Sequence, residues 1–149
     1  MNSDALSMHV RIPPHARFSR TVRKEVAAFA RRLNVRGPEL DEFIFALGEA
    51  LANAIEHGKG DAIDVRCNVE DDKILATVTD AGAGFGAHGL ATMSLPNEYA
   101  ERGRGLPIMR RCTDIFAVHS IPGRGTAVVL GRYLPVGQRA WPEESEIAS

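Results

Sequence analysis

Two kinds of hydrophobic spacing divide the chain into predicted strands and helices. The strands are expected over residues 7–13, 62–70, 73–80, 114–121 and 125–134. The first of them ends at two prolines, which places it at an edge of the sheet. The second and third are separated only by a short turn, as in a β-hairpin, and another short turn joins the last two.

Apolar residues recur every three or four positions in the stretches that are predicted to be helices. One helix is expected over residues 20–34 with Ser19 as its N-cap, and a second runs from the acidic turn at Glu39 to Gly58. A short third helix follows residue 105. Strands joined by turns, with helices segregated from them, predict an α+β fold: a two-layer α/β sandwich with a mainly antiparallel or mixed sheet and helices on one face.

Composition limits the kind of protein this can be. The chain has 149 residues, of which 44% are hydrophobic and 25% charged, as in an ordinary globular domain. We expect a single domain over residues 1–134 and a mobile tail over 135–149, where periodicity is almost absent. Two cysteines without a CxxC pair indicate neither a disulfide framework nor a zinc site. No apolar stretch is long enough to cross a membrane and no signal peptide is present, so we expect a cytoplasmic protein.

Charge is distributed unevenly along the chain, although the net value is only −1. Residues 1–36 hold eight Lys or Arg against two acids, and the remainder holds ten against seventeen. The near-neutral total gives no case for direct nucleic-acid binding. The basic N-terminal part could dock an acidic partner, but a solvated helix face is the simpler interpretation.

Three polar residues share one face of the second predicted helix. On a helical wheel with about 100° per residue, Asn53 and His57 both lie less than 90° around the helix axis from Glu49. A separate apolar stripe would anchor this helix to the sheet: Phe43, Leu47, Leu51, Ala54 and Ile55. Ala46 and Ala50 lie beside the polar trio, where small side chains would leave room for a ligand. On this helix alone, a water-facing trio would be the simpler interpretation.

A carboxylate at the end of a strand makes a ligand site more plausible. Asp80 lies an even number of residues from the apolar positions of strand 73–80, so its side chain should point to the same, core-facing side of the sheet. A carboxylate there needs a partner. Gly82 and Gly84 follow it and would allow a flat ligand to lie against bare backbone. A simple turn after the strand would also account for these glycines.

Two further glycine motifs complete the pattern. Gly103 and Gly105 flank Arg104 at the start of the third predicted helix, where free backbone N–H groups and the helix dipole favour phosphate. Gly125 precedes Thr126 at the start of the last strand, and the threonine hydroxyl could support Asp80.

Together these motifs resemble the N, G1, G2 and G3 boxes of the GHKL ATPase/kinase superfamily, with its Bergerat-type fold. The corresponding segments are E-x-x-x-N-x-x-x-H at 49–57, D-x-G-x-G-F at 80–85, G-x-G-L at 103–106 and G-T at 125–126. The resemblance covers residues 8–134 or so. In its short length and in the sequence EALANAIEHG, the chain most resembles the anti-sigma-factor serine kinases of bacterial partner-switching systems.

The resemblance implies roles for these residues in binding Mg²⁺ and ATP. Asn53 would be the Mg²⁺ ligand through its amide oxygen, and Asp80 would accept a hydrogen bond from the adenine amino group, supported by Thr126. Gly82 and Gly84 would shape the adenine pocket. The phosphates would be held by the G2 box and its neighbours, under a lid formed by residues 86–102: Arg102, Gly103, Arg104, Gly105 and Leu106.

Glu49 would be the catalytic residue, a general base for a serine or threonine hydroxyl. His57 is expected to cap or pack near the helix end. Implied partners are an anti-sigma-antagonist (STAS-type) protein and a sigma factor or equivalent regulator, with a homodimer built on the apolar residues of the first strand and helix. The alternative is a non-catalytic module that binds ATP and sequesters a regulator.

Some features depart from common family patterns or suggest other folds. Pro107 follows the G2 box, and the lid has no lysine to contact phosphate. Residues 84–89 match G-x-G-x-x-G, but they run into a polar loop and not into a helix, so a Rossmann fold is not predicted. No P-loop motif is present.

Overall fold

A computed structural model describes residues 6–58, 60–80, 109–121 and 125–135 of the chain. Its elements follow the order β1 (Ser7–Ile12), α1 (Arg17–Arg32), α2 (Gly37–His57), β2 (Ile63–Val69), β3 (Lys73–Asp80), β4 (Ile115–Ile121) and β5 (Gly125–Tyr133). Each predicted strand and both long helices are present. The short third helix is described only over its end, at residues 109–111, where Met109 is buried and Cys112 half-buried.

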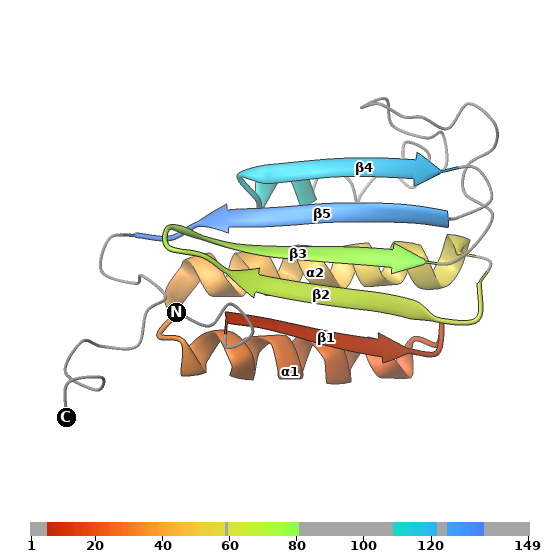
Figure 1. The fold of residues 1–149 in the computed structure, drawn as a ribbon, viewed down its shortest axis with the longest axis horizontal. Coiled ribbons are helices and arrows are strands. Elements are labelled where there is room, and N and C mark those ends of the chain that lie inside the picture. The colour runs from red at the N-terminus through yellow and green to blue at the C-terminus, as the bar shows by residue number, and fades with distance from the viewer. Residues whose placement is uncertain (1–5, 59, 81–108, 122–124, 136–149) are drawn as a thin grey trace.

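The five strands form one sheet in the order β1-β2-β3-β5-β4, and all neighbouring strands are antiparallel. Helices α1 and α2 lie side by side on one face of this sheet, with α2 behind its centre (Figure 1). The predicted two-layer α+β sandwich is therefore confirmed, and the sheet is antiparallel throughout.

The core lies between the sheet and the two helices. One row across the sheet consists of four buried valines on neighbouring strands: Val65, Val78, Val128 and Val118. From the other layer, α2 contributes its largest buried side chains, Leu40, Phe43, Leu47 and Leu51. Burying each large aliphatic or aromatic side chain contributes roughly 1.5–3 kcal/mol, so this central layer supplies much of the stability. Cys67 is part of the same core, and burial raises the pKa of its thiol to about 12.

The predicted helix boundaries need two corrections. Helix α1 begins at Arg17, with Ala16 as N-cap and no side-chain cap, so Ser19 lies inside the helix and is not its N-cap. Helix α2 begins at Gly37 and places a proline in its first turn, where the missing N–H costs nothing. The helix therefore starts two residues before the predicted acidic turn at Glu39, with Gly37 and Pro38 in its first turn.

Apolar residues of the first strand and helix contribute to the core. Val22 and Val26 of α1 are fully buried, and Met8 and Val10 of β1 pack against the same core. Met8 and Val10 are only partly buried, and the homodimer built on this strand and helix stays a prediction.

An ion-pair network joins the start of α2 to β5 and to the residue before β4. The guanidinium of Arg132 binds Glu42 of α2, and its Nη1 lies 3.2 Å from Oδ2 of Asp114. The backbone N–H of Tyr133 donates to the same Asp114 oxygen at 2.8 Å. This network fixes the chain between residue 109 and β4 relative to α2. Within the described part of the chain, no helix combines the length and apolarity needed to cross a membrane.

Candidate functional site

Four polar side chains are buried within the described part of the chain. They are Asn53 at 1% exposure, Asp80 at 7%, Ser120 at 4% and Thr126 at 4%. Burying polar groups is costly unless they are hydrogen-bonded or bind a ligand, so these four positions need an explanation. Three of them are predicted ligand-binding residues.

Three of the four form a row across neighbouring strands. Asp80 of β3 lies directly opposite Thr126 of β5, which lies directly opposite Ser120 of β4. Directly opposite residues point to the same face, and here it is the face covered by the helices, as the parity of Asp80 predicts. Gly125 precedes Thr126 with a φ of 101°, a conformation that favours glycine at the start of β5.

The C-terminal end of α2 packs directly against this row. A Cβ atom placed on Gly58 would lie 3.0 Å from Cβ of Asp80 and 2.4 Å from the carbonyl oxygen of Ala54. The Gly58 N–H also donates to that carbonyl at 2.8 Å, which closes the helix. Only a residue without a side chain fits here. The contact brings the helix that carries Asn53 to the strand end that carries Asp80.

Asn53 is the most unusual of the four residues. Neither its Oδ1 nor its Nδ2 has a hydrogen-bond partner among the residues that the structure describes. Leaving a buried amide unsatisfied costs about 1–3 kcal/mol. An amide oxygen is a hard ligand suited to Mg²⁺, which typically takes one or two protein oxygens and completes its shell with phosphate oxygens and water. The buried, unsatisfied Oδ1 therefore fits the metal-binding role, and the interpretation that Asn53 faces water is wrong.

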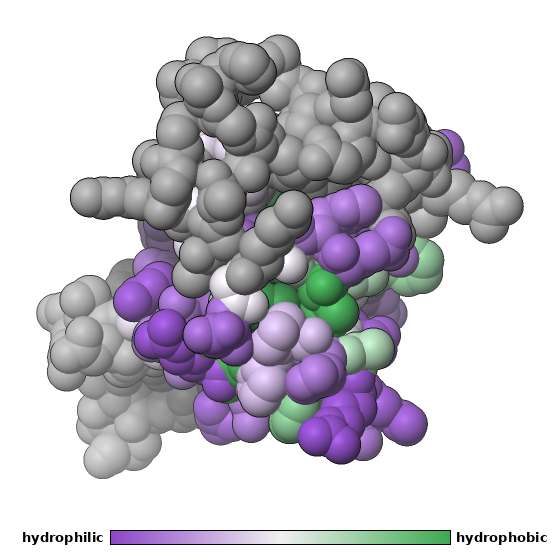
Figure 2. Space-filling model, turned by 90° about the vertical axis from the view of Figure 1, so that its right-hand side faces the viewer, coloured by the Kyte–Doolittle hydropathy of each residue, from purple (hydrophilic) through white to green (hydrophobic). Residues whose placement is uncertain are grey.

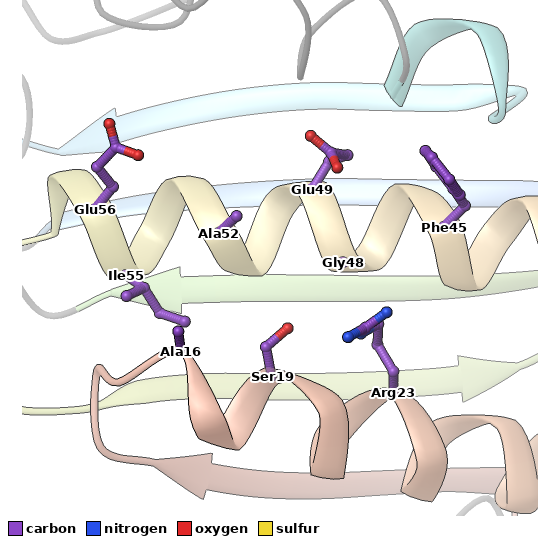
Figure 3. Close-up of a pocket in the computed structure, with 9 residues that line it drawn as sticks. All are labelled: Ala16, Ser19, Arg23, Phe45, Gly48, Glu49, Ala52, Ile55 and Glu56. Carbon is purple, nitrogen blue, oxygen red and sulfur yellow. The ribbon is translucent and has the colours of Figure 1, made fainter.

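Glu49 and His57 have surroundings different from those of Asn53. Glu49 is half-buried and projects from the side of α2 that faces away from α1, as do Phe45 and Glu56 (Figure 3). Nε2 of His57 lies 3.7 Å from Oε1 of Glu56, an arrangement suited to a role at the helix end. The predicted trio thus divides into one buried amide and two partly exposed groups.

Two small residues and one large residue of α2 also differ from expectation. Ala46 and Ala50 are fully buried, so they pack in the core and do not line open space. Ile55, expected in the sheet-facing stripe, is only partly buried and lines the space between the helices.

A groove of about 430 Å³ lies alongside α1 and α2. Its lining comprises Ala16, Ser19, Arg23, Phe45, Gly48, Glu49, Ala52, Ile55 and Glu56. Arg23 and Ser19 point from α1 towards α2 (Figure 3). Gly48 has no side chain to push Arg23 away, since a Cβ there would lie 3.0 Å from Cδ of Arg23. The buried Nε of Arg23 has no hydrogen-bond partner among the described residues, so the groove contains a cation available to a ligand or partner.

Viewed from the side of the molecule where β3 and α2 end, hydrophobic surface is bordered by hydrophilic residues (Figure 2). The structure places Asp80 directly opposite Thr126, and it packs the C-terminal end of the helix that carries Asn53 and Glu49 against Asp80. The remaining predicted ligand-binding positions lie outside the described residues: Gly82, Gly84, Arg102, Gly103, Arg104, Gly105, Leu106 and the lid at 86–102. Gly58, Ser120 and Arg23 were not predicted as site residues, and the only sequence signal among them is the helix-terminating position of Gly58.

Comparison with known proteins agrees with this geometry. The model of a family described as the histidine kinase-like ATPase domain matches residues 12–132. The chain belongs to this family. The resemblance inferred from the four motifs is thereby confirmed.

Relatives of this histidine kinase-like ATPase domain include several anti-sigma F factors. One from Caldanaerobacter subterraneus subsp. tengcongensis is 35% identical over 125 residues, which cover 78% of this chain and 84% of the relative. Another from Geobacillus kaustophilus is 29% identical over 134 residues, covering 85% of this chain and 92% of the relative. The similarity thus extends over nearly the whole of these short proteins.

Two solved structures share the fold. The structure of the RsbU and RsbW domains of a Mycobacterium tuberculosis protein matches with a TM-score of 0.65 and 19% identity, covering 86% of this chain and 32% of that one. A histidine kinase domain from Erythrobacter litoralis matches with a TM-score of 0.52 and 20% identity, covering 85% of this chain and 63% of that one. This chain therefore spans about a third of the first structure and less than two thirds of the second.

Proposed function

We propose that this chain is an ATP-dependent serine/threonine protein kinase that also acts as an anti-sigma regulator. It phosphorylates an anti-sigma-antagonist protein of the STAS type and sequesters a sigma factor or an equivalent regulator. The observation that carries the proposal is the buried, unsatisfied Asn53 amide on a helix whose C-terminal end packs against the buried Asp80 carboxylate. Family membership supports ATP binding, and the anti-sigma F factors among the relatives support the regulatory role.

Each end of the nucleotide has a matching group in this arrangement. Asp80 accepts a hydrogen bond from the adenine amino group, and Thr126 directly opposite supports it. Asn53 supplies an amide oxygen to Mg²⁺, which would neutralise phosphate charge when bound. We also propose phosphate-binding roles for the glycines and arginines of segment 102–106, and adenine-pocket roles for Gly82 and Gly84.

Glu49 carries the catalytic part of the proposal. Its carboxylate takes the proton from a serine or threonine hydroxyl of the partner while that oxygen attacks the γ-phosphorus and the bond to the bridging oxygen breaks, releasing ADP. The groove that Glu49 lines gives a partner segment a place to present this hydroxyl, with Arg23 available to bind an acidic group nearby.

The test is incubation of the chain with γ-labelled ATP, Mg²⁺ and its antagonist partner, followed by mapping of the label. We expect label on a serine or threonine of the partner, and almost none with Glu49→Gln. ATP affinity of this variant should stay within about tenfold of wild type, or roughly 1.4 kcal/mol, because Glu49 acts on the acceptor hydroxyl. Loss of ATP binding together with transfer would show that this role for Glu49 is wrong.

The alternative is a module that binds ATP and sequesters a regulator without catalysis. Glu49 favours the kinase, because a sequestration module needs no carboxylate at this position. Bound nucleotide without any labelled partner would support the alternative.

The organisation of the protein completes the proposal. We propose that residues 1–134 form the kinase domain and that residues 135–149 are a C-terminal tail. The homodimer stays a prediction that sedimentation analysis can check.

A further inference from the structure

Ser120 is a buried polar residue to which neither the motifs nor the proposed function gives a role. It lies near the end of β4 and is 4% exposed. The other three buried polar residues of the described chain are all nucleotide-site candidates. Ser120 extends their row by one strand, because it pairs with Thr126, which pairs with Asp80.

The neighbouring row of the sheet shows that this position does not require a polar residue for packing. Two residues along each strand, on the same face, the four positions are all valine: Val65, Val78, Val128 and Val118. In the row of Ser120, the corresponding residues on β2, β3 and β5 are Ile63, Asp80 and Thr126. The valine row is entirely apolar, whereas the row of Ser120, two residues further along the sheet, has one apolar and three polar residues. The polar side chains of β3, β5 and β4 therefore gather in one row at the end of the sheet, where the C-terminal end of α2 packs against Asp80.

Resting on the proposed function, we propose that Ser120 is a positioning residue of the nucleotide site that acts through Thr126 on Asp80. Side chains at directly opposite positions of antiparallel strands have Cβ atoms about 4.5–5.5 Å apart, so the two hydroxyls are within reach by rotation of χ1. An ionised carboxylate only accepts hydrogen bonds, whereas a hydroxyl donates one and accepts others. With nucleotide bound, Ser120 donates to Thr126 and directs the single Thr126 proton towards Asp80.

The consequence is a contribution to base selectivity. An Asp80 carboxylate held in this way stays an acceptor aimed at the 6-amino group of adenine, whereas guanine has a carbonyl oxygen, another acceptor, at that position. Ser120 therefore favours ATP over GTP without touching the base.

The experiment compares ATP and GTP affinities, by titration calorimetry with Mg²⁺, for the full chain and three variants. Ser120→Ala should weaken ATP binding about five- to tenfold, as expected for the loss of one hydrogen bond between neutral groups, and leave GTP binding unchanged. Ser120→Thr keeps the hydroxyl on a β-branched side chain suited to a strand and should retain the wild-type ratio within about twofold. Val118→Ala is the matched control, on the same strand and face with the same 4% exposure. It should lower the melting temperature and leave the ratio unchanged.

A purely structural role for Ser120 gives a different pattern. Ser120→Ala would then keep the wild-type ATP to GTP ratio, or Val118→Ala would change that ratio as much, and either result would overturn the inference alone. A wild-type chain that binds no ATP would overturn the proposed function as well.

Discussion

Replacing Gly58 by alanine tests the contact between α2 and the buried row. The added methyl group would lie 2.4 Å from the Ala54 carbonyl oxygen, which is backbone and cannot rotate away, and 3.0 Å from Cβ of Asp80. Overpacking of this kind costs about 1–3 kcal/mol. In a chain of 149 residues, each kcal/mol lowers the melting temperature by roughly 2–4 °C. We therefore expect Gly58→Ala to melt roughly 2–12 °C below wild type and to bind ATP more weakly, because Asp80 must move.

Gly48→Ala is the matched control on the same helix. Its Cβ would meet only the flexible side chain of Arg23, with Cδ nearest at 3.0 Å. Alanine inside a helix is favoured over glycine by roughly 0.5–1 kcal/mol, so this variant should melt at the wild-type temperature or above. Differential scanning calorimetry and ATP titration of both variants provide the comparison. Wild-type stability and affinity in Gly58→Ala would refute the close packing inferred at this helix end.

Three other properties can be predicted from the described residues. Asn53→Leu should raise the free energy of unfolding by about 1–2 kcal/mol, because it removes an unsatisfied buried amide. The same variant should lose Mg²⁺-dependent ATP binding. Urea titrations that show a destabilised variant would contradict this prediction. Burial raises the pKa of the Cys67 thiol from 9.0 in the unfolded chain to about 12 in the fold, so its contribution to stability is fully present below pH 9. Between pH 9 and about 12, the free energy of unfolding should fall by about 1.4 kcal/mol per pH unit. Cys67→Ala should remove this contribution to the pH dependence. Arg132→Lys should lower the free energy of unfolding by about 1 kcal/mol, because a lysine ammonium cannot bind Glu42 and Asp114 at the same time as the planar guanidinium does. A melting temperature equal to that of wild type would show that the network contributes nothing to stability.

Local patterns in the sequence predict the elements and the face of Asp80 well. Alternation identifies all five strands, and parity alone places Asp80 on the covered face. Ser19 was wrongly predicted to be the N-cap. Serine is a favoured N-cap residue, but the basic and apolar residues around Ser19 do not show whether the helix begins before it or after it. The first turn of α2 was missed because Gly-Pro both ends and starts helices.

Features that depend on strand order could not be predicted in the same way. Ser120 joins the site only because β5 lies between β3 and β4, and a single hydroxyl in a strand gives no signal of that order. The burial of Asn53 depends on how far α2 is rotated towards the sheet. A helical wheel gives relative directions around the axis but not which of them faces the core, so Asn53 could not be distinguished from Glu49 by spacing alone.

A crystal structure of the chain with Mg²⁺ and a non-hydrolysable ATP analogue tests the central claim most directly. The account predicts the adenine amino group on the Asp80 carboxylate beside Thr126, and a metal ion bound by Oδ1 of Asn53. Nucleotide bound elsewhere, with the Asn53 amide satisfied by protein groups and Asp80 away from the base, would contradict it.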